Sequence, residues 1–232
     1  MSVKVIVSYD GTANEDDAIA LGRLFGQAGA EVGLAYVRHT TEPDRDRETL
    51  AQAEAEDLLR RGAKLLGDPN APTYVVTDRS TPEGLDALAS SQNAQVIVFC
   101  SDSHTAKGHV AIGNSAERLL EGARAAVAIA PVDLAETLGT SGVRNIVAIG
   151  DGDGGARRTA ESLANALHGT VAPVVGADTD LLVVDSRPEA DQGRIAITAS
   201  AQHLIEIATC PVLVLPRDTA LEFGGTRTVA AA

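Results

Sequence analysis

A loop between residues 100 and 115 carries residue types suited to holding an anion. It follows a short apolar run, residues 96–99, and leads into the sequence Gly113-Asn114-Ser115-Ala116-Glu117. The apolar run predicts a strand buried on both faces of a parallel sheet, and Asn114 is expected to cap the helix that follows. The free N–H groups and the dipole of a helix start favour phosphate. The segment is therefore a candidate phosphate loop, with a plain strand–helix connector as the alternative.

A second candidate residue is Asp10, which follows the apolar run 4–9 and precedes Gly11-Thr12. Acidic residues at positions 15–17 then suit the first turn of a helix. The carboxyl ends of parallel strands lie at one edge of a sheet, so Asp10 is expected at the same edge as the loop. It either contacts a ligand there or only turns the chain and caps the helix.

Other chemistries have weaker support. The spacing of Asp102, His104 and His109 fits no strong zinc motif, so no metal is expected. Cys100 has only His104 nearby in sequence as a base, and a packed thiol is the simpler interpretation. The glycines at 152–155 alternate with acids and no P-loop lysine follows, which indicates a turn. We expect no catalytic residues.

Strands and helices alternate strictly through the first 131 residues. Strands are predicted at 4–9, 31–39, 73–77, 96–99 and 125–130, with amphipathic helices between them. Such alternation predicts an α/β fold with a doubly wound, mainly parallel sheet covered by helices on both faces.

The pattern then restarts. Residues 144–149 resemble residues 3–8 at an offset of about 140, whereas residues 181–185 match 96–100 at an offset of 85. The shorter offset predicts a second, truncated domain of the same α/β type that has lost its middle helices and a strand. The expected boundaries are a complete domain at 1–132, a linker at 133–143, a truncated domain at 144–217 and a flexible tail at 218–232.

Composition narrows the classes of partner. The chain has 232 residues, a formal net charge of −13 and 3% aromatic residues. No basic patch or aromatic stacking platform is visible, so nucleic acid is not an expected partner. Its longest apolar runs are far shorter than the ~20 residues that span a bilayer, and the start carries no export signal, so we expect a cytoplasmic protein without membrane contact.

Two motifs resemble those of the universal stress protein family. They are Val7-Ser8-Tyr9-Asp10-Gly11-Thr12 and Cys100-x2-Ser103-x9-Gly113-Asn114-Ser115, and the resemblance extends over nearly the whole chain. It implies that Asp10 and Val37 hold an adenine and that the second motif holds phosphates of ATP or AMP. The implied binding residues are Asp10, Val37, Cys100, Ser103, Gly113, Asn114 and Ser115.

Three positions depart from the family motif. Cys100 and Ser103 replace glycines, and Asn114 replaces a serine or threonine. Side chains at glycine positions narrow a loop or exclude torsions that a phosphate needs, so we expect weak or absent ATP binding. In the second half Asp185 and Pro188 occupy the glycine positions, and no nucleotide is expected there.

The resemblance implies a non-enzymatic stress-response or regulatory protein that binds an adenine nucleotide weakly in its first domain. The alternatives are an interaction module that binds no nucleotide and, third, an enzyme of the adenine nucleotide α-hydrolase-like group. The expected partners are an unidentified client protein and the chain itself, through its last strands, as a pseudo-dimer or a homodimer.

The truncated half is expected to need cover for its sheet. Apolar residues in the linker and the tail are the candidates for that cover: Leu134, Leu138, Leu221 and Phe223.

Overall fold

One mixed sheet runs through both halves of the chain. The computed structural model describes residues 2–12, 14–102, 104–150 and 154–224. Within these ranges the sheet has nine strands in the order β3-β2-β1-β4-β5-β9-β8-β6-β7. The strands are β1 Lys4–Ser8, β2 Glu31–Arg38, β3 Thr73–Thr77, β4 Val96–Cys100, β5 Ala126–Ala130, β6 Asn145–Ile149, β7 Thr170–Ala172, β8 Leu181–Asp185 and β9 Val212–Leu215.

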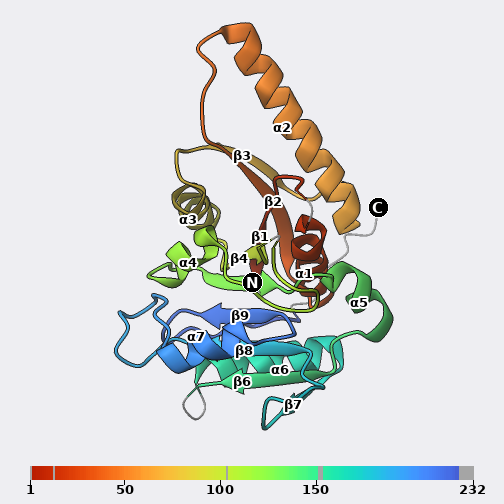
Figure 1. Cartoon of the computed structure of the whole chain (residues 1–232), viewed down its shortest axis with the longest axis vertical. Coiled ribbons are helices and arrows are strands. Elements are labelled where there is room, and N and C mark those ends of the chain that lie inside the picture. Colours follow the sequence, from red (N-terminus) through yellow and green to blue (C-terminus); the bar gives the residue numbers. More distant parts are fainter. Residues whose placement is uncertain (1, 13, 103, 151–153, 225–232) are drawn as a thin grey trace.

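Helices cover both faces of the sheet and form two apolar layers. The first layer contains buried side chains of α1, α2, α5 and α6, and the second contains those of α3, α4 and α7. In Figure 1 the strands of the second half lie beneath those of the first, and α2 extends beyond the strands that it covers. The helices are α1 Glu15–Gln27, α2 Arg45–Leu66, α3 Thr81–Gln92, α4 Asn114–Leu120, α5 Leu134–Ser141, α6 Gly155–Leu167 and α7 Ala199–Glu206.

The long helix α2 illustrates how local sequence sets an element. The carboxylate of Asp44 accepts the N–H groups of Asp46 and Arg47 at 3.1 and 3.0 Å, which satisfies free amides at the helix start. Gly67 ends the helix in the left-handed conformation (φ 87°), which glycine adopts without a Cβ clash. None of the described helices combines the length and apolar character needed to cross a membrane.

The two halves join through β5 and β9, which are antiparallel neighbours in an otherwise parallel sheet. Ala128 is opposite Leu213, 85 positions later, and Val127 is opposite Val214. This register has a local two-fold axis at the Ala128–Leu213 pair, as in an isologous dimer interface. The prediction that the last strands of the two halves face each other is confirmed.

Backbone hydrogen bonds repeat the same symmetry outside the strands. Val110 donates its N–H to the carbonyl of Ala208 at 3.0 Å, and Ile195 donates to Ala123 at 2.9 Å. Ile195 is 85 positions after Val110, and Ala123 is 85 positions before Ala208. The junction is therefore made by matching contacts from each half.

Segments outside the repeated units cover the junction on the α1 side. The residues expected as a linker form the helix α5, and its Leu134 is buried in the first layer. In the tail, Leu221 and Phe223 are also buried, and the Phe223 ring stacks on Phe25 with centroids 5.7 Å apart. The predicted covering role of Leu134, Leu221 and Phe223 is confirmed, and Leu138 packs beside them. Leu221 and Phe223 thus pack this part of the tail on the protein, whereas 225–232 lie outside the described residues.

The predicted α/β class with a doubly wound, mainly parallel sheet is confirmed, and the strands of both halves belong to one sheet. The second half contributes four strands, fewer than the five of the first. The three-residue strand β7 and the helix α7 are not among the elements predicted from the sequence. Both are short, so their periodicity is too weak to identify them from sequence.

Candidate functional site

The turn between β1 and α1 is closed by a buried carboxylate. Glu15 is 6% exposed, and its Oε2 accepts the backbone N–H of Gly11 at 2.7 Å and also that of Asp10. Asp10 is exposed, and its Oδ1 accepts the N–H of Thr12 at 2.9 Å. Gly11 has φ 79°, and Leu58 of α2 lies against it. Glycine is required there because a side chain would be both strained and crowded.

The protonation of Glu15 follows from its surroundings. Burial, the larger cause, and the nearby carboxylate of Asp10 together raise its pKa to about 8. The two donated N–H groups favour the charged form, but they are outweighed. At neutral pH the side chain is therefore mainly protonated.

Asp17 joins this turn to the second half of the chain. Its carboxylate accepts the N–H groups of Asp133 and Ala135 at 2.9 and 2.8 Å, so it caps the start of α5 from a distant helix. Burial raises the pKa of Asp17, while these two hydrogen bonds lower it.

Cys100 lies at the same edge, because β4 pairs in parallel with β1. Burial raises the pKa of its thiol to about 12, and Glu15, Asp10 and Asp17 add to the effect. The thiol is therefore protonated and a poor nucleophile at neutral pH. The structure thus brings Asp10 and Cys100 to one acidic edge, as the strand order requires.

Ser101 holds the candidate phosphate loop in place. It is 2% exposed, donates its hydroxyl to the carbonyl of Ala130 at 2.6 Å and accepts the N–H of Ala111 at 3.0 Å. Ser186, 85 positions later, makes the corresponding bonds to Leu215 and Ala196 at 2.7 and 3.1 Å. Sequence reasoning missed both serines, although their shared offset of 85 was visible.

The start of α4 differs from the predicted cap. Gly113 is the N-cap residue in an extended conformation, and Asn114 is the first helical residue, with no side-chain capping hydrogen bond. The expected cap by Asn114 is wrong, because an N-cap residue must itself be non-helical. No atom lies within 4 Å of a Cβ built on Gly113, so the space beside Gly113 is open. Asn114 and the half-buried Ser115 follow it, while Ser103 lies outside the described residues.

Val37 lies near the end of β2 but is covered. Its side chain is buried in the second apolar layer, together with Ile6 and Leu85. Gly84 of α3 is so close that an added Cβ would lie 3.3 Å from Val37 Cγ1. Val37 therefore packs against α3 at this edge, with little of its surface exposed.

The corresponding edge of the second half is filled by the chain itself. Asp185 accepts the N–H of Ala156 at 2.7 Å, at the start of α6. The carbonyl of Thr219 lies so close to Gly155 that an added Cβ would be 2.0 Å from its oxygen. Thr198 caps α7 by accepting the N–H of Ala201 at 3.1 Å. At least one N–H group at the start of each of these helices therefore already has an acceptor within the chain.

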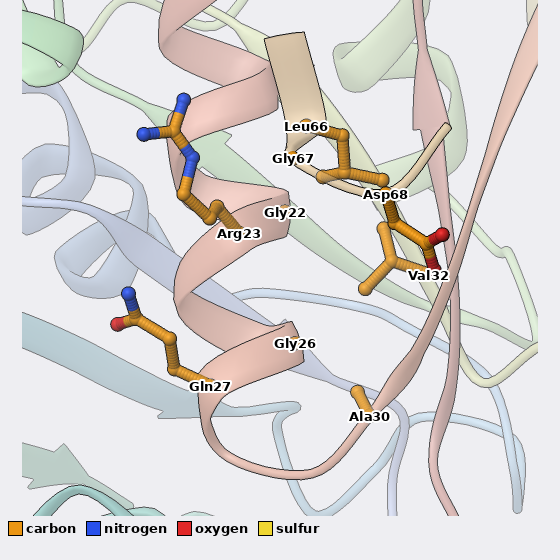
Figure 2. A pocket seen from close by; sticks show the side chains of 9 residues that line it. All are labelled: Gly22, Arg23, Gly26, Gln27, Ala30, Val32, Leu66, Gly67 and Asp68. Atoms are coloured by element: carbon orange, nitrogen blue, oxygen red, sulfur yellow. The ribbon is translucent and has the colours of Figure 1, made fainter. Parts of the chain in front are cut away.

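A hollow of about 260 Å³ lies elsewhere, between α1 and the end of α2 (Figure 2). Ala30 and Val32 place it at the amino end of β2, opposite the carboxyl edge that carries Asp10. Gly22 and Gly26 of α1 line it, and Arg23 and Gln27 extend from the same helix. Among the described residues, no group of three or more His, Cys, Asp or Glu side chains could hold a metal ion.

Comparisons with known proteins agree with this architecture. A universal stress protein of Archaeoglobus fulgidus DSM 4304 superposes with a TM-score of 0.68 at 14% identity, over 92% of this chain and 98% of that one. A functionally unknown protein of Pseudomonas aeruginosa PAO1 gives a TM-score of 0.60 at 13% identity, over 93% and 92%. No curated protein matches the chain. The family model described as "Universal stress protein family" matches residues 1–131, and the chain therefore belongs to that family.

Proposed function

We propose that this chain is a non-catalytic regulatory protein of the stress response, cytoplasmic, whose first half binds an adenine nucleotide weakly. The proposal rests on family membership and on the edge formed by β1 and β4. Residues 1–132 form the binding unit in this proposal. Residues 144–217 are a truncated copy that pairs with it as a pseudo-dimer, and an unidentified client protein is the expected partner.

A buried amide in the β1–α1 turn is the observation that carries the proposal. The side-chain nitrogen of Asn14 is buried and has no hydrogen-bond partner among the described residues. A buried donor without an acceptor costs ~1–3 kcal/mol. A small opening of the turn would let an oxygen of a bound ribose or phosphate reach this nitrogen and supply the acceptor.

The proposed contacts follow the shape of the edge. Asp10 is exposed beside the turn and would accept from the adenine, and the buried Val37 would border the base. The amides of Asn114 and Ser115, with Gly113 before them, would receive a phosphate in open space. Cys100 borders the phosphate region, and Ser103 completes the implied set.

The charge of the edge predicts a preference among ligands. Asp10 and Asp17 bring negative charge to the region beside Cys100. Repulsion grows with the charge of the ligand, so ATP should bind less well than AMP or adenosine. Loss of ~1.5–3 kcal/mol for each missing charge-assisted hydrogen bond would leave an affinity near the millimolar range.

Titration calorimetry with adenosine, AMP and ATP tests the proposal. Gly113→Val should abolish binding, and Gly122→Val is its matched control at the other end of α4. Neither substitution meets an atom within 4 Å of the added Cβ, so both variants should fold. If Gly122→Val weakens AMP binding as much as Gly113→Val does, the phosphate is not held at the start of α4.

The second candidate is an interaction module that binds no nucleotide. The filled edge of the second half favours it, because Asp185 and Thr219 occupy the space beside α6. This candidate predicts no heat with any of the three ligands, at protein concentrations where millimolar binding would be detected.

A further inference from the structure

A second hollow lies on the local two-fold axis that relates the halves. It has a volume of about 330 Å³, at the lower end of the range of ~300–1,000 Å³ typical of ligand pockets. It lies between α4 and α7, and we call it the dyad groove. Its apolar lining includes Ile112, Leu120 and Ile197, and its acidic lining is Glu117, Glu121 and Glu206.

The lining of the dyad groove repeats with the offset of 85. Ile197 corresponds to Ile112, and Glu206 corresponds to Glu121. Each half therefore contributes one isoleucine and at least one glutamate. The backbone contacts Val110–Ala208 and Ile195–Ala123 fix the two walls relative to each other.

Negative charge surrounds the apolar surface of the groove. Glu117, Glu121 and Glu206 are exposed. Cations also lie at this rim: Arg118, 3.7 Å from Glu121, and Arg194, which donates to the carbonyl of Gly122 at 2.7 Å. Glu206 accepts an amide hydrogen from Gln202 at 3.0 Å. The chain as a whole carries −13, so its field adds to this local charge. The complementary ligand is a cation with an apolar body.

We propose that the dyad groove binds a linear aliphatic polyamine. The methylene chain would lie over Ile112, Leu120 and Ile197, and ammonium groups at its two ends would meet the glutamates of α4 and α7. A ligand with like ends matches a site with a local two-fold axis. Within the described residues these carboxylates do not converge as a metal cluster, which favours a long cation over a metal ion.

Calorimetry of the full chain with spermidine at fixed ionic strength tests the proposal. The double variant Glu121→Gln, Glu206→Gln should weaken spermidine binding about tenfold. Each exposed carboxylate is expected to contribute about two- to fivefold, and the two losses multiply. The matched control is Glu54→Gln, which removes an exposed carboxylate of α2 that does not line the dyad groove. It should change the affinity for spermidine less than about twofold. Equal losses in the control and the double variant would overturn the proposal.

A ligand series on the unmodified protein separates the apolar contact from charge alone. 1,4-Diaminobutane should bind more tightly than Mg²⁺ of the same charge, because only the diamine has methylenes to bury. Equal affinity for the two would mean diffuse counterion attraction and would contradict the proposal. Binding of a lysine-rich peptide without binding of either amine would identify a protein surface instead, and would also contradict it.

Discussion

The backbone N–H of Gly11 donates to the carboxylate of Glu15 at 2.7 Å, so an acid of α1 closes the turn that follows the first strand. This acid is buried at the edge where we propose that a nucleotide binds. Its protonation affects the stability of the turn and the charge of the edge together. Glu15 is consequently the residue at which pH should act most directly on the first half.

Stability should fall as pH rises between about 4.5 and about 8. The pKa of Glu15 is raised from 4.5 to about 8 in the folded chain, so the folded state keeps a proton that the unfolded state has released. Such a group stabilises the fold fully below pH 4.5, and its contribution is lost as pH passes 8. Over this range we expect the free energy of unfolding to decline by about 2–4 kcal/mol because of this group.

Urea unfolding at several pH values compares the parent chain with Glu15→Gln. The variant keeps an acceptor for the N–H of Gly11 but cannot ionise. Its free energy of unfolding should therefore decline less with rising pH than that of the parent, by about 2–4 kcal/mol. Glu54→Gln should leave the pH dependence unchanged. If the free energy of unfolding changed with pH in the same way in the parent and in Glu15→Gln, folding would not raise the pKa of Glu15.

The sequence predicted the sheet better than it predicted this edge. Unbroken apolar runs such as 96–99 identify buried parallel strands, and their alternation with amphipathic helices predicts a doubly wound sheet. That β5 and β9 face each other followed from two β-rich runs that would otherwise be exposed edges, and the structure adds that they pair in antiparallel. These features depend on patterns that span many residues, so single substitutions do not hide them.

Removing the hydroxyl of Ser101 should destabilise the first half. Ser101→Ala would leave the partly buried N–H of Ala111 without its acceptor and would remove the buried hydrogen bond to Ala130, at a cost of ~1–3 kcal/mol. Ser186→Ala should have a similar effect through Ala196. Denaturant unfolding gives the free energy of unfolding of both variants. The control is Ser90→Ala, at an exposed position, which should stay within about 0.5 kcal/mol of the parent. Losses no larger than that of the control would mean that these hydroxyls do not hold the loops.

Truncating Phe223 should release the tail from α1. Phe223→Ala removes the buried ring that stacks on Phe25, and we expect a loss of about 3–4 kcal/mol in the free energy of unfolding. Phe223→Leu keeps most of the apolar volume and should cost less than half as much. A loss in Phe223→Ala no larger than that in a surface substitution, about 0.5 kcal/mol, would show that the buried ring does not hold the tail on α1.

The site was less predictable because its contacts join residues far apart in sequence. Nothing in the sequence around Asp17 indicates that it caps α5, 116 positions later at Asp133. The burial of Glu15 depends on the fold of the turn, whereas acids at a helix start are usually exposed. Asn114 matched a capping pattern, but Gly113 took the N-cap position, and boundaries of this kind often differ by one residue.

The proposed function is tested most directly by calorimetric titration of AMP and ATP into the parent chain and Asp10→Ala at pH 7. We predict an AMP affinity near the millimolar range, weaker binding of ATP, and loss of AMP binding in Asp10→Ala, because Asp10 is the exposed acceptor at the edge of β1. Sub-micromolar binding of ATP that is abolished by Asp10→Ala would contradict the predicted effect of the acidic edge and of the side chains at Cys100 and Ser103.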